Sequence, residues 1–178
     1  MTKSLLLTLV MQSQIFAQQR SVDEICKTTT CRSPHEIQIP LDDAHYKVFN
    51  IPKSPFVDDG VVNVANEEVV HVKVNQKDGK VISLEYSSVP ADIEISFNVK
   101  RAVPASSTTM VIKSNLDKPF IYSILVNAPK SDWRFFATSS CPVKAKMSTY
   151  ENWPHPISQV VLRNFRFVNT GTSECKKY

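Results

Sequence analysis

The chain has 178 residues, of which 42% are hydrophobic and 21% charged, and its formal net charge is +4. This length fits one ordinary domain. Lysines and acids alternate along it without a basic stripe, which excludes a nucleic-acid surface of the usual kind. The chain contains no Asn-x-Ser/Thr glycosylation site, and this leans toward a bacterial export route.

Residues 1–17 have the order of a secretory signal peptide. A single charge at Lys3 precedes the apolar run 5–11, and a polar stretch then ends at Ala17. The run is too short to cross a bilayer, which needs roughly 20 apolar residues. We therefore expect a mature chain that begins at Gln18, has no membrane span and is periplasmic or secreted.

Four cysteines in an oxidising compartment predict two disulfides, for which three pairings are possible. We favour Cys26 with Cys31 and Cys141 with Cys175. Five residues along a helix would place the first two side chains about 140° apart, so residues 27–30 should form a turn or loop. The larger ring should stabilise the fold by roughly 4 kcal/mol and the smaller by roughly 2 kcal/mol. A zinc site would need tight ligand pairs, and a redox site would need Cys-x-x-Cys.

Apolar and polar residues alternate with a period of two along most of the mature chain, which predicts strands. Residues 68–86 predict a hairpin closed at Asp78-Gly79. Further strands are expected at 36–41, 46–51, 93–100, 109–113, 120–126, 133–138 and 157–168. The alternation shifts near Asn164, which indicates a bulge. No mature segment has a convincing helical stripe.

Eight or nine short strands joined by Pro-rich turns indicate an all-β fold, an immunoglobulin-like antiparallel β-sandwich. We assign it to residues 34–178 as a single domain, preceded by an N-terminal segment, 18–33, that holds the small disulfide loop. A closed barrel is the lesser alternative.

Two stretches carry a resemblance to known proteins. Residues 114–120 (SNLDKPF) resemble the Asn-x-x-Asp-Lys-Pro turn between strands of many bacterial immunoglobulin-like domains. Residues 139–143, 150–157 and 164–166 resemble a group of secreted or periplasmic bacterial proteins with no assigned function. The resemblance covers about the last third of the chain. It implies the fold and the compartment, and no catalytic residue.

Candidates for chemistry are few. The four histidines, at positions 35, 45, 71 and 155, are scattered and form no ligand motif; a copper or zinc site assembled in space is the alternative to our expectation of no metal and no cofactor. His71 should face solvent. Ser139 and Ser140 lack the glycine-rich surroundings of a hydrolase nucleophile. Asp58-Asp59-Gly60 is expected to form a turn instead of a calcium loop.

The segment Tyr150–Pro156 is the one that strand formation explains poorly. Two prolines flank His155, and Trp153 brings a large amphipathic ring to an expected loop. We take Tyr150, Glu151, Trp153 and His155 as candidate binding residues, because Trp and Tyr are favoured at interaction hot spots. In the alternative, Trp153 folds back over one end of the sandwich.

The sequence thus favours a non-catalytic binding or assembly module in the periplasm or outside the cell. Its partner would be a protein or another component of the cell envelope, and not a nucleic acid. The runner-up is a small secreted hydrolase or metal-dependent enzyme, which would need a concave pocket where polar side chains converge.

Overall fold

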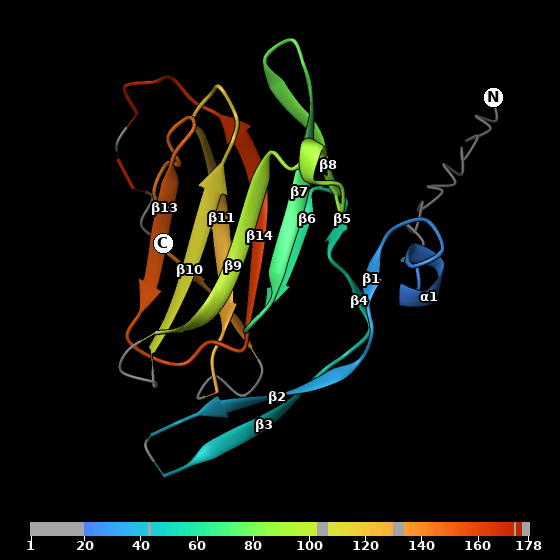
Figure 1. Cartoon of the computed structure of the whole chain (residues 1–178), viewed down its shortest axis with the longest axis vertical. Helices are drawn as coiled ribbons and strands as arrows, with labels where there is room; N and C mark the ends of the chain where they lie inside the picture. The colour runs from blue at the N-terminus through green and yellow to red at the C-terminus, as the bar shows by residue number, and fades with distance from the viewer. Residues whose placement is uncertain (1–19, 43, 103–106, 130–133, 173, 176–178) are drawn as a thin grey trace, which may run out of the picture.

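The computed structural model describes residues 20–42, 44–102, 107–129, 134–172 and 174–175. Two five-stranded antiparallel sheets pack face to face (Figure 1). The first sheet has the order β13 (Ser148–Trp153), β10 (Ser107–Ser114), β9 (Ile95–Ala102), β7 (Val69–Lys77) and β8 (Lys80–Tyr86). The second has the order β12 (Phe135–Thr138), β11 (Phe120–Asn127), β14 (Gln159–Phe167), β6 (Val61–Ala65) and β5 (Val57–Asp58).

Two short ribbons lie outside the sandwich. The first pairs β1 (Cys31–Arg32) with β4 (Ser54–Pro55), and the second is the hairpin of β2 (His35–Pro40) and β3 (Tyr46–Ile51). Figure 1 shows this hairpin running beneath one end of the two sheets. The described part of the chain also contains a four-residue helix, α1 (Val22–Ile25), and one 3-10 turn, η1 (Pro90–Asp92).

The core lies between the sheets, where the inward residues of each strand meet. Its largest fully buried side chains include Tyr122, Phe97 and Phe120. Phe165 of β14 packs against all three rings, with centroid distances of 5.9 to 6.1 Å. Aromatic contacts of this kind add to the stabilisation from area burial. The period-two alternation therefore reports a real division between an inner and an outer face.

The local predictions for turns and irregularities are confirmed. Asp78 and Gly79 both have positive φ, 51° and 72°, as a two-residue hairpin turn of the favoured twist requires. Asp59 and Gly60 form a second such turn between β5 and β6. Asn164 has φ 60° where the pairing of β11 with β14 shifts register, so the predicted bulge is present.

The N-terminal segment contains the one helix that the alternation did not predict. Ser21 accepts a hydrogen bond from the Glu24 backbone N–H, and the Glu24 carboxylate accepts one from the Ser21 backbone N–H. This reciprocal capping box is readable as Ser-x-x-Glu in the sequence. Four residues are too few to show a helical stripe, which is why periodicity missed the element.

Both predicted disulfides are present, with sulfur–sulfur distances of 2.00 Å for Cys26–Cys31 and 2.08 Å for Cys141–Cys175. The segment between the first two cysteines forms turns, as expected. Two intramolecular disulfides indicate an oxidising, non-cytoplasmic location.

The all-β sandwich in a single domain is confirmed. Among the described residues, no helix is long and apolar enough to span a membrane. The predicted signal peptide, residues 1–17, lies outside the described residues.

Candidate binding surface at one end of the sandwich

The β2–β3 hairpin is anchored by one apolar face. Ile39, Phe49 and Ile51 are almost fully buried, and together with Ile37 they pack on Ala65 at the end of β6. These residues alternate along the two strands, so the hairpin presents a single buried face to the end of the sandwich. The Lys47 ammonium on the same face donates to the Pro129 carbonyl at 3.3 Å, which ties the ribbon to the segment after β11.

The opposite face of the hairpin is exposed and mixed in character, with two apolar side chains beside the polar residues Glu36, Gln38 and Asn50. Tyr46 is 62% exposed and Val48 is 42% exposed. At the tip, the Asp42 carboxylate accepts hydrogen bonds from the backbone N–H groups of Ala44 and His45, both at 2.8 Å. These bonds, led by the one from Ala44, hold the pKa of Asp42 below its usual range. Asp42 thus holds the backbone of Ala44 and His45 beside the two outward apolar side chains.

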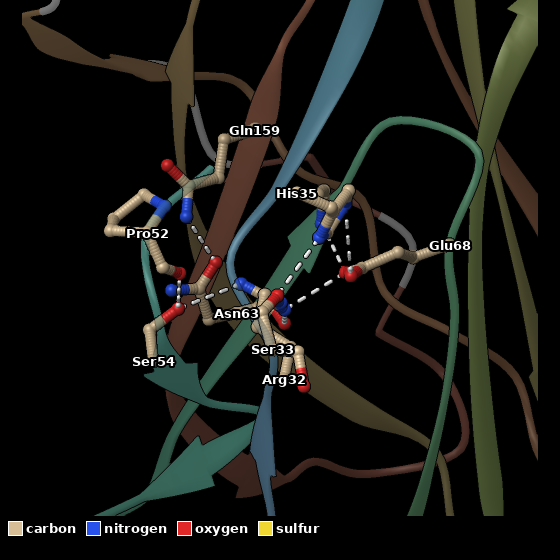
Figure 2. Close-up of polar contacts among 9 residues, drawn as sticks. Arg32, Ser33, His35, Pro52, Ser54, Asn63, Glu68 and Gln159 are labelled. Atoms are coloured by element: carbon tan, nitrogen blue, oxygen red, sulfur yellow. Dashed lines mark hydrogen bonds and ion pairs between the residues drawn. The ribbon is translucent and has the colours of Figure 1, made fainter. Parts of the chain in front are cut away.

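A buried arginine fixes the base of the hairpin (Figure 2). Arg32 ends β1, three residues before β2 begins, and its guanidinium donates to Ser54 of β4, three residues after β3 ends, at 3.1 Å. Its other amino group donates to the Asn63 carbonyl of β6 at 2.6 Å and lies 2.9 Å from Glu68. The ring of Phe56 stacks below, 4.9 Å from the guanidinium carbon. One side chain thus joins both ends of the hairpin to the sandwich.

Burial lowers the pKa of Arg32, and the neighbouring Glu68 carboxylate opposes that shift. An arginine nonetheless stays charged at any ordinary pH. The cost of desolvating this charge is compensated by the carboxylate, the two oxygen acceptors and the ring. The arrangement is therefore a rigid structural attachment for the hairpin.

An exposed aromatic edge lies next to the hairpin. β12 is the last strand of the second sheet, and its Phe135 and Phe136 are 41% and 39% exposed. Being adjacent, they point to opposite faces of the strand. Phe136 lies beside His155, with ring centroids 6.3 Å apart. Unpaired edges with exposed aromatic residues are sites where natural sheets meet partners.

Two hollows connect these features. The first, of about 480 Å³, lies between Val48 of the hairpin and Phe135 of β12. The second, of about 310 Å³, is lined by Leu41, Lys47, His155 and the prolines Pro129, Pro154 and Pro156. We call the exposed residues Leu41, Tyr46, Val48, Phe135 and Phe136, together with the two hollows, the end surface. It combines apolar side chains with backbone edges that no strand among the described residues covers.

The structure separates the candidate binding residues proposed from the sequence. Tyr150 to Trp153 belong to strand β13, not to a loop, so they alternate between its faces. Tyr150 is 61% exposed on the outer face of the first sheet, whereas Trp153 is 6% exposed and lies in the core. The indole N–H faces the Thr138 hydroxyl at 3.4 Å. This position matches the alternative in which Trp153 covers one end of the sandwich, and only His155 reaches the end surface.

Glu151 also points inward. Its carboxylate accepts hydrogen bonds from the Tyr122 hydroxyl at 2.9 Å and from the Cys141 backbone N–H at 3.2 Å. Burial raises the pKa of Glu151 above its ordinary 4.5, against the opposing effect of these two bonds. Burial likewise raises the pKa of Tyr122. The pair ties β11 and β13 together beside the second disulfide, so its role is structural.

The other chemical candidates are also placed. Ser140 is buried and its hydroxyl donates to the Tyr122 carbonyl at 2.8 Å, which leaves it committed to the fold. His71 is half-buried on the outer face of β7, where solvent exposure was expected. Within the described ranges, no three His, Cys, Asp or Glu residues are grouped so that they could hold a metal ion.

Sequence reasoning missed most of the end surface. The strands that carry it were predicted, but their exposed aromatic residues were not singled out. One signal was available: Tyr46, Val48, Phe49 and Ile51 place apolar residues on both faces of one strand. A two-stranded ribbon has only one face to bury against a sheet, so the apolar pair Tyr46 and Val48 on the second face favours contact with a partner.

Comparison with protein-family models, curated proteins and solved structures finds no match to this chain.

Proposed function

We propose that this protein is an exported, non-catalytic binding or assembly module that contacts a protein partner through the end surface. The observation that carries the proposal is the clustering of exposed apolar residues. The described residues include eleven large hydrophobic side chains that are exposed, and five of them belong to the end surface. Contiguous apolar patches of this kind mark protein interaction sites.

The chemistry of the surface supports a protein partner. Aromatic anchors beside hollows are typical of interface hot spots. The free edges of β12 and of the hairpin offer backbone N–H and C=O groups, to which an extended segment of a partner can add as a strand. The anchored hairpin base keeps the surface preorganised, which lowers the entropic cost of binding.

Export is the second element of the proposal. The apolar run 5–11 and Ala17 support cleavage by a signal peptidase, and the two disulfides support an oxidising compartment, in the periplasm or outside the cell. Intact-mass measurement on exported protein should give a chain that begins at Gln18. Recovery of a full-length form with the membranes would contradict export as a free domain.

The binding proposal is tested by capture from native envelope or medium, with a photocrosslinking amino acid placed at position 135, where an exposed phenylalanine of the end surface faces Val48 across the first hollow. We expect a discrete crosslinked protein that disappears with the variant Tyr46→Ser/Val48→Ser. The matched control is Ile82→Ser/Val89→Ser, which removes two equally exposed side chains from elsewhere on the surface. Equal loss of the adduct in both variants would show non-specific apolar contact and would contradict the proposal.

A further inference from the structure

The outer face of the first sheet carries a third hollow, which shares no lining residue with the two hollows of the end surface. It has a volume of about 420 Å³ and is lined by residues of four neighbouring strands. The strand register places Tyr150, Val111, Asn98 and Val69 in one row across β13, β10, β9 and β7. The row therefore begins at an exposed aromatic ring and continues over a floor that Val111 and Asn98 form.

Two lysines lie on either side of this row. Lys113 is two residues beyond Val111 on β10, and Lys100 is two residues beyond Asn98 on β9. The two strands are antiparallel, so the lysines extend in opposite directions, and their Cα atoms are separated along the strands by about 14 Å. Both side chains are exposed. The two lysines are therefore anchored at separate points along the strands.

No acidic residue of the hollow balances the positive charge of its two lysines. None of its lining residues is acidic, and neither lysine forms an ion pair in the part of the chain that the structure describes. His71 lines the same hollow, and its Nδ1 atom is buried without a hydrogen-bond partner among the described residues. That atom has almost no exposed surface, so a ligand on the outer face cannot reach it; the two unbalanced lysines are what favour a ligand with negative charge.

We propose that this hollow binds an extended acidic polysaccharide, whose carboxylates or sulfates contact Lys100 and Lys113 while its sugar rings cross the row from Tyr150 to Asn98. The exposed tyrosine supplies a rigid amphipathic ring, and Asn98 and Ser96 supply hydrogen-bonding groups for sugar hydroxyls. Two well-separated cations suit a chain with repeated negative charges. This surface is distinct from the end surface, so the two proposals stand independently.

An acidic peptide fits this face less well. Peptides dock on free strand edges or insert side chains into apolar pockets. Here the hollow extends from the edge strand β13 over β10, β9 and β7, and the backbone groups of the last three strands are already paired on both sides. Its aliphatic lining residues are Val69, which is 45% exposed, and Val111, which is almost fully covered. Away from the edge of β13 the face therefore offers only side chains, which is the chemistry that sugar hydroxyls and acidic groups use.

The experiment uses the exported, disulfide-bonded protein and fluorescently labelled oligogalacturonate as the probe. Binding is measured by fluorescence anisotropy at low and physiological salt. We expect Lys100→Ala/Lys113→Ala to weaken binding by about tenfold or more, the loss typical of hot-spot removal, and to reduce its salt dependence. Tyr150→Ala should weaken binding by about fivefold. All these side chains are exposed, so the melting temperature should stay unchanged.

Matched controls separate this site from general attraction to a basic protein. Lys77→Ala/Lys80→Ala removes the same charge from the exposed tip of the β7–β8 hairpin, and it should leave binding within about twofold. Methyl-esterified oligogalacturonate keeps the sugar chain without the charge, and we expect it not to bind. Equal weakening by the control lysines, equal binding of the ester, or equal binding of polyglutamate or single-stranded DNA would each overturn the proposal.

A heparin oligosaccharide distinguishes sulfate from carboxylate. Stronger binding of heparin that still depends on Lys100, Lys113 and Tyr150 would support the site and assign it to sulfated chains. The variant Tyr46→Ser tests whether the hollow and the end surface are separate sites. It should abolish the protein adduct and leave polysaccharide binding intact. Loss of polysaccharide binding in this variant would contradict a separate site.

Discussion

The two-sheet body and the β2–β3 hairpin use different means to hold their shape. The body closes over a continuous core to which both sheets contribute, whereas the hairpin buries four apolar side chains on Ala65. The hairpin compensates with a buried charge, because Arg32 joins its two ends to β6 and to Glu68. A region with a small core can thus be held in a fixed position by one polar network at its base.

The comparison also explains where interaction surfaces arise. Residues inside the body are committed to packing, and its inner faces leave no side chain available to a ligand. The hairpin and the edge strand β12 keep one apolar face free, and the outer face of the first sheet keeps its cations free. Binding capacity is therefore located where burial is incomplete, a division that the following predictions test in order of expected effect.

The strongest test of the body is Trp153→Ala. The indole is 6% exposed within the core, so its removal should lower the free energy of unfolding by about 3 to 5 kcal/mol. Tyr150→Ala, on the same strand and 61% exposed, should change stability by about 0.5 kcal/mol or less. Chemical denaturation of both variants checks the contrast, and similar curves would contradict the interior position of the indole.

The two disulfides should contribute unequally to stability, and the disulfide in the two-sheet body should contribute more. Cys141→Ser/Cys175→Ser opens the larger ring, in the body, and should cost about 4 kcal/mol of stability, against about 2 kcal/mol for Cys26→Ser/Cys31→Ser at the hairpin side. Thermal melts of the two double variants measure the difference. A larger loss for the small ring would show that the N-terminal segment, and not the body, limits stability.

Arg32→Met tests the attachment of the hairpin. Removing the guanidinium should cost about 2 kcal/mol, because Glu68 is only partly buried and can regain water. Hydrogen exchange should accelerate in β2 and β3 before it does in β10 and β11. Arg20→Met, which breaks an exposed 3.1 Å pair with Asp58, is the control and should have almost no effect. Uniform acceleration over both regions would refute a local attachment.

The smallest expected effect is the pH dependence from Glu151. Burial raises the folded-state pKa of this carboxyl above its ordinary 4.5, so the folded state binds the proton more tightly than the unfolded state. Its stabilising contribution is present at low pH and is lost as the pH rises through the folded-state value.

Glu151→Gln removes this titration. The amide oxygen can still accept hydrogen bonds from the Tyr122 hydroxyl and the Cys141 N–H. The variant should therefore gain stability relative to the natural protein as the pH rises above about 4.5. Urea denaturation of both proteins at a series of pH values measures the difference in their stability. A difference that does not change with pH would exclude the titration of Glu151 as its source.

Several features of the fold follow from local sequence alone. Val70, Val72 and Val74 alternate with polar residues, and Asp78-Gly79 follows them in the chain. This local pattern predicts a hairpin regardless of the sheet that the hairpin joins. The cysteine pairing was also predictable, because a ring as short as Cys26–Cys31 constrains only its own turn. The strand character of Tyr150 to Trp153 was missed, since the prolines that follow suggested a loop, whereas they only end β13.

The sequence by itself predicted most of the strands and turns, a favoured cysteine pairing and an oxidising compartment, because these depend on residues close together along the chain or on composition. Tertiary structure alone decided which faces are free. Val48 and Phe135 line one hollow although they are far apart in the sequence, and Tyr150 meets Lys100 and Lys113 only through the order of β13, β10 and β9. Strand order and the placement of a ribbon arise from long-range packing, which no local pattern encodes.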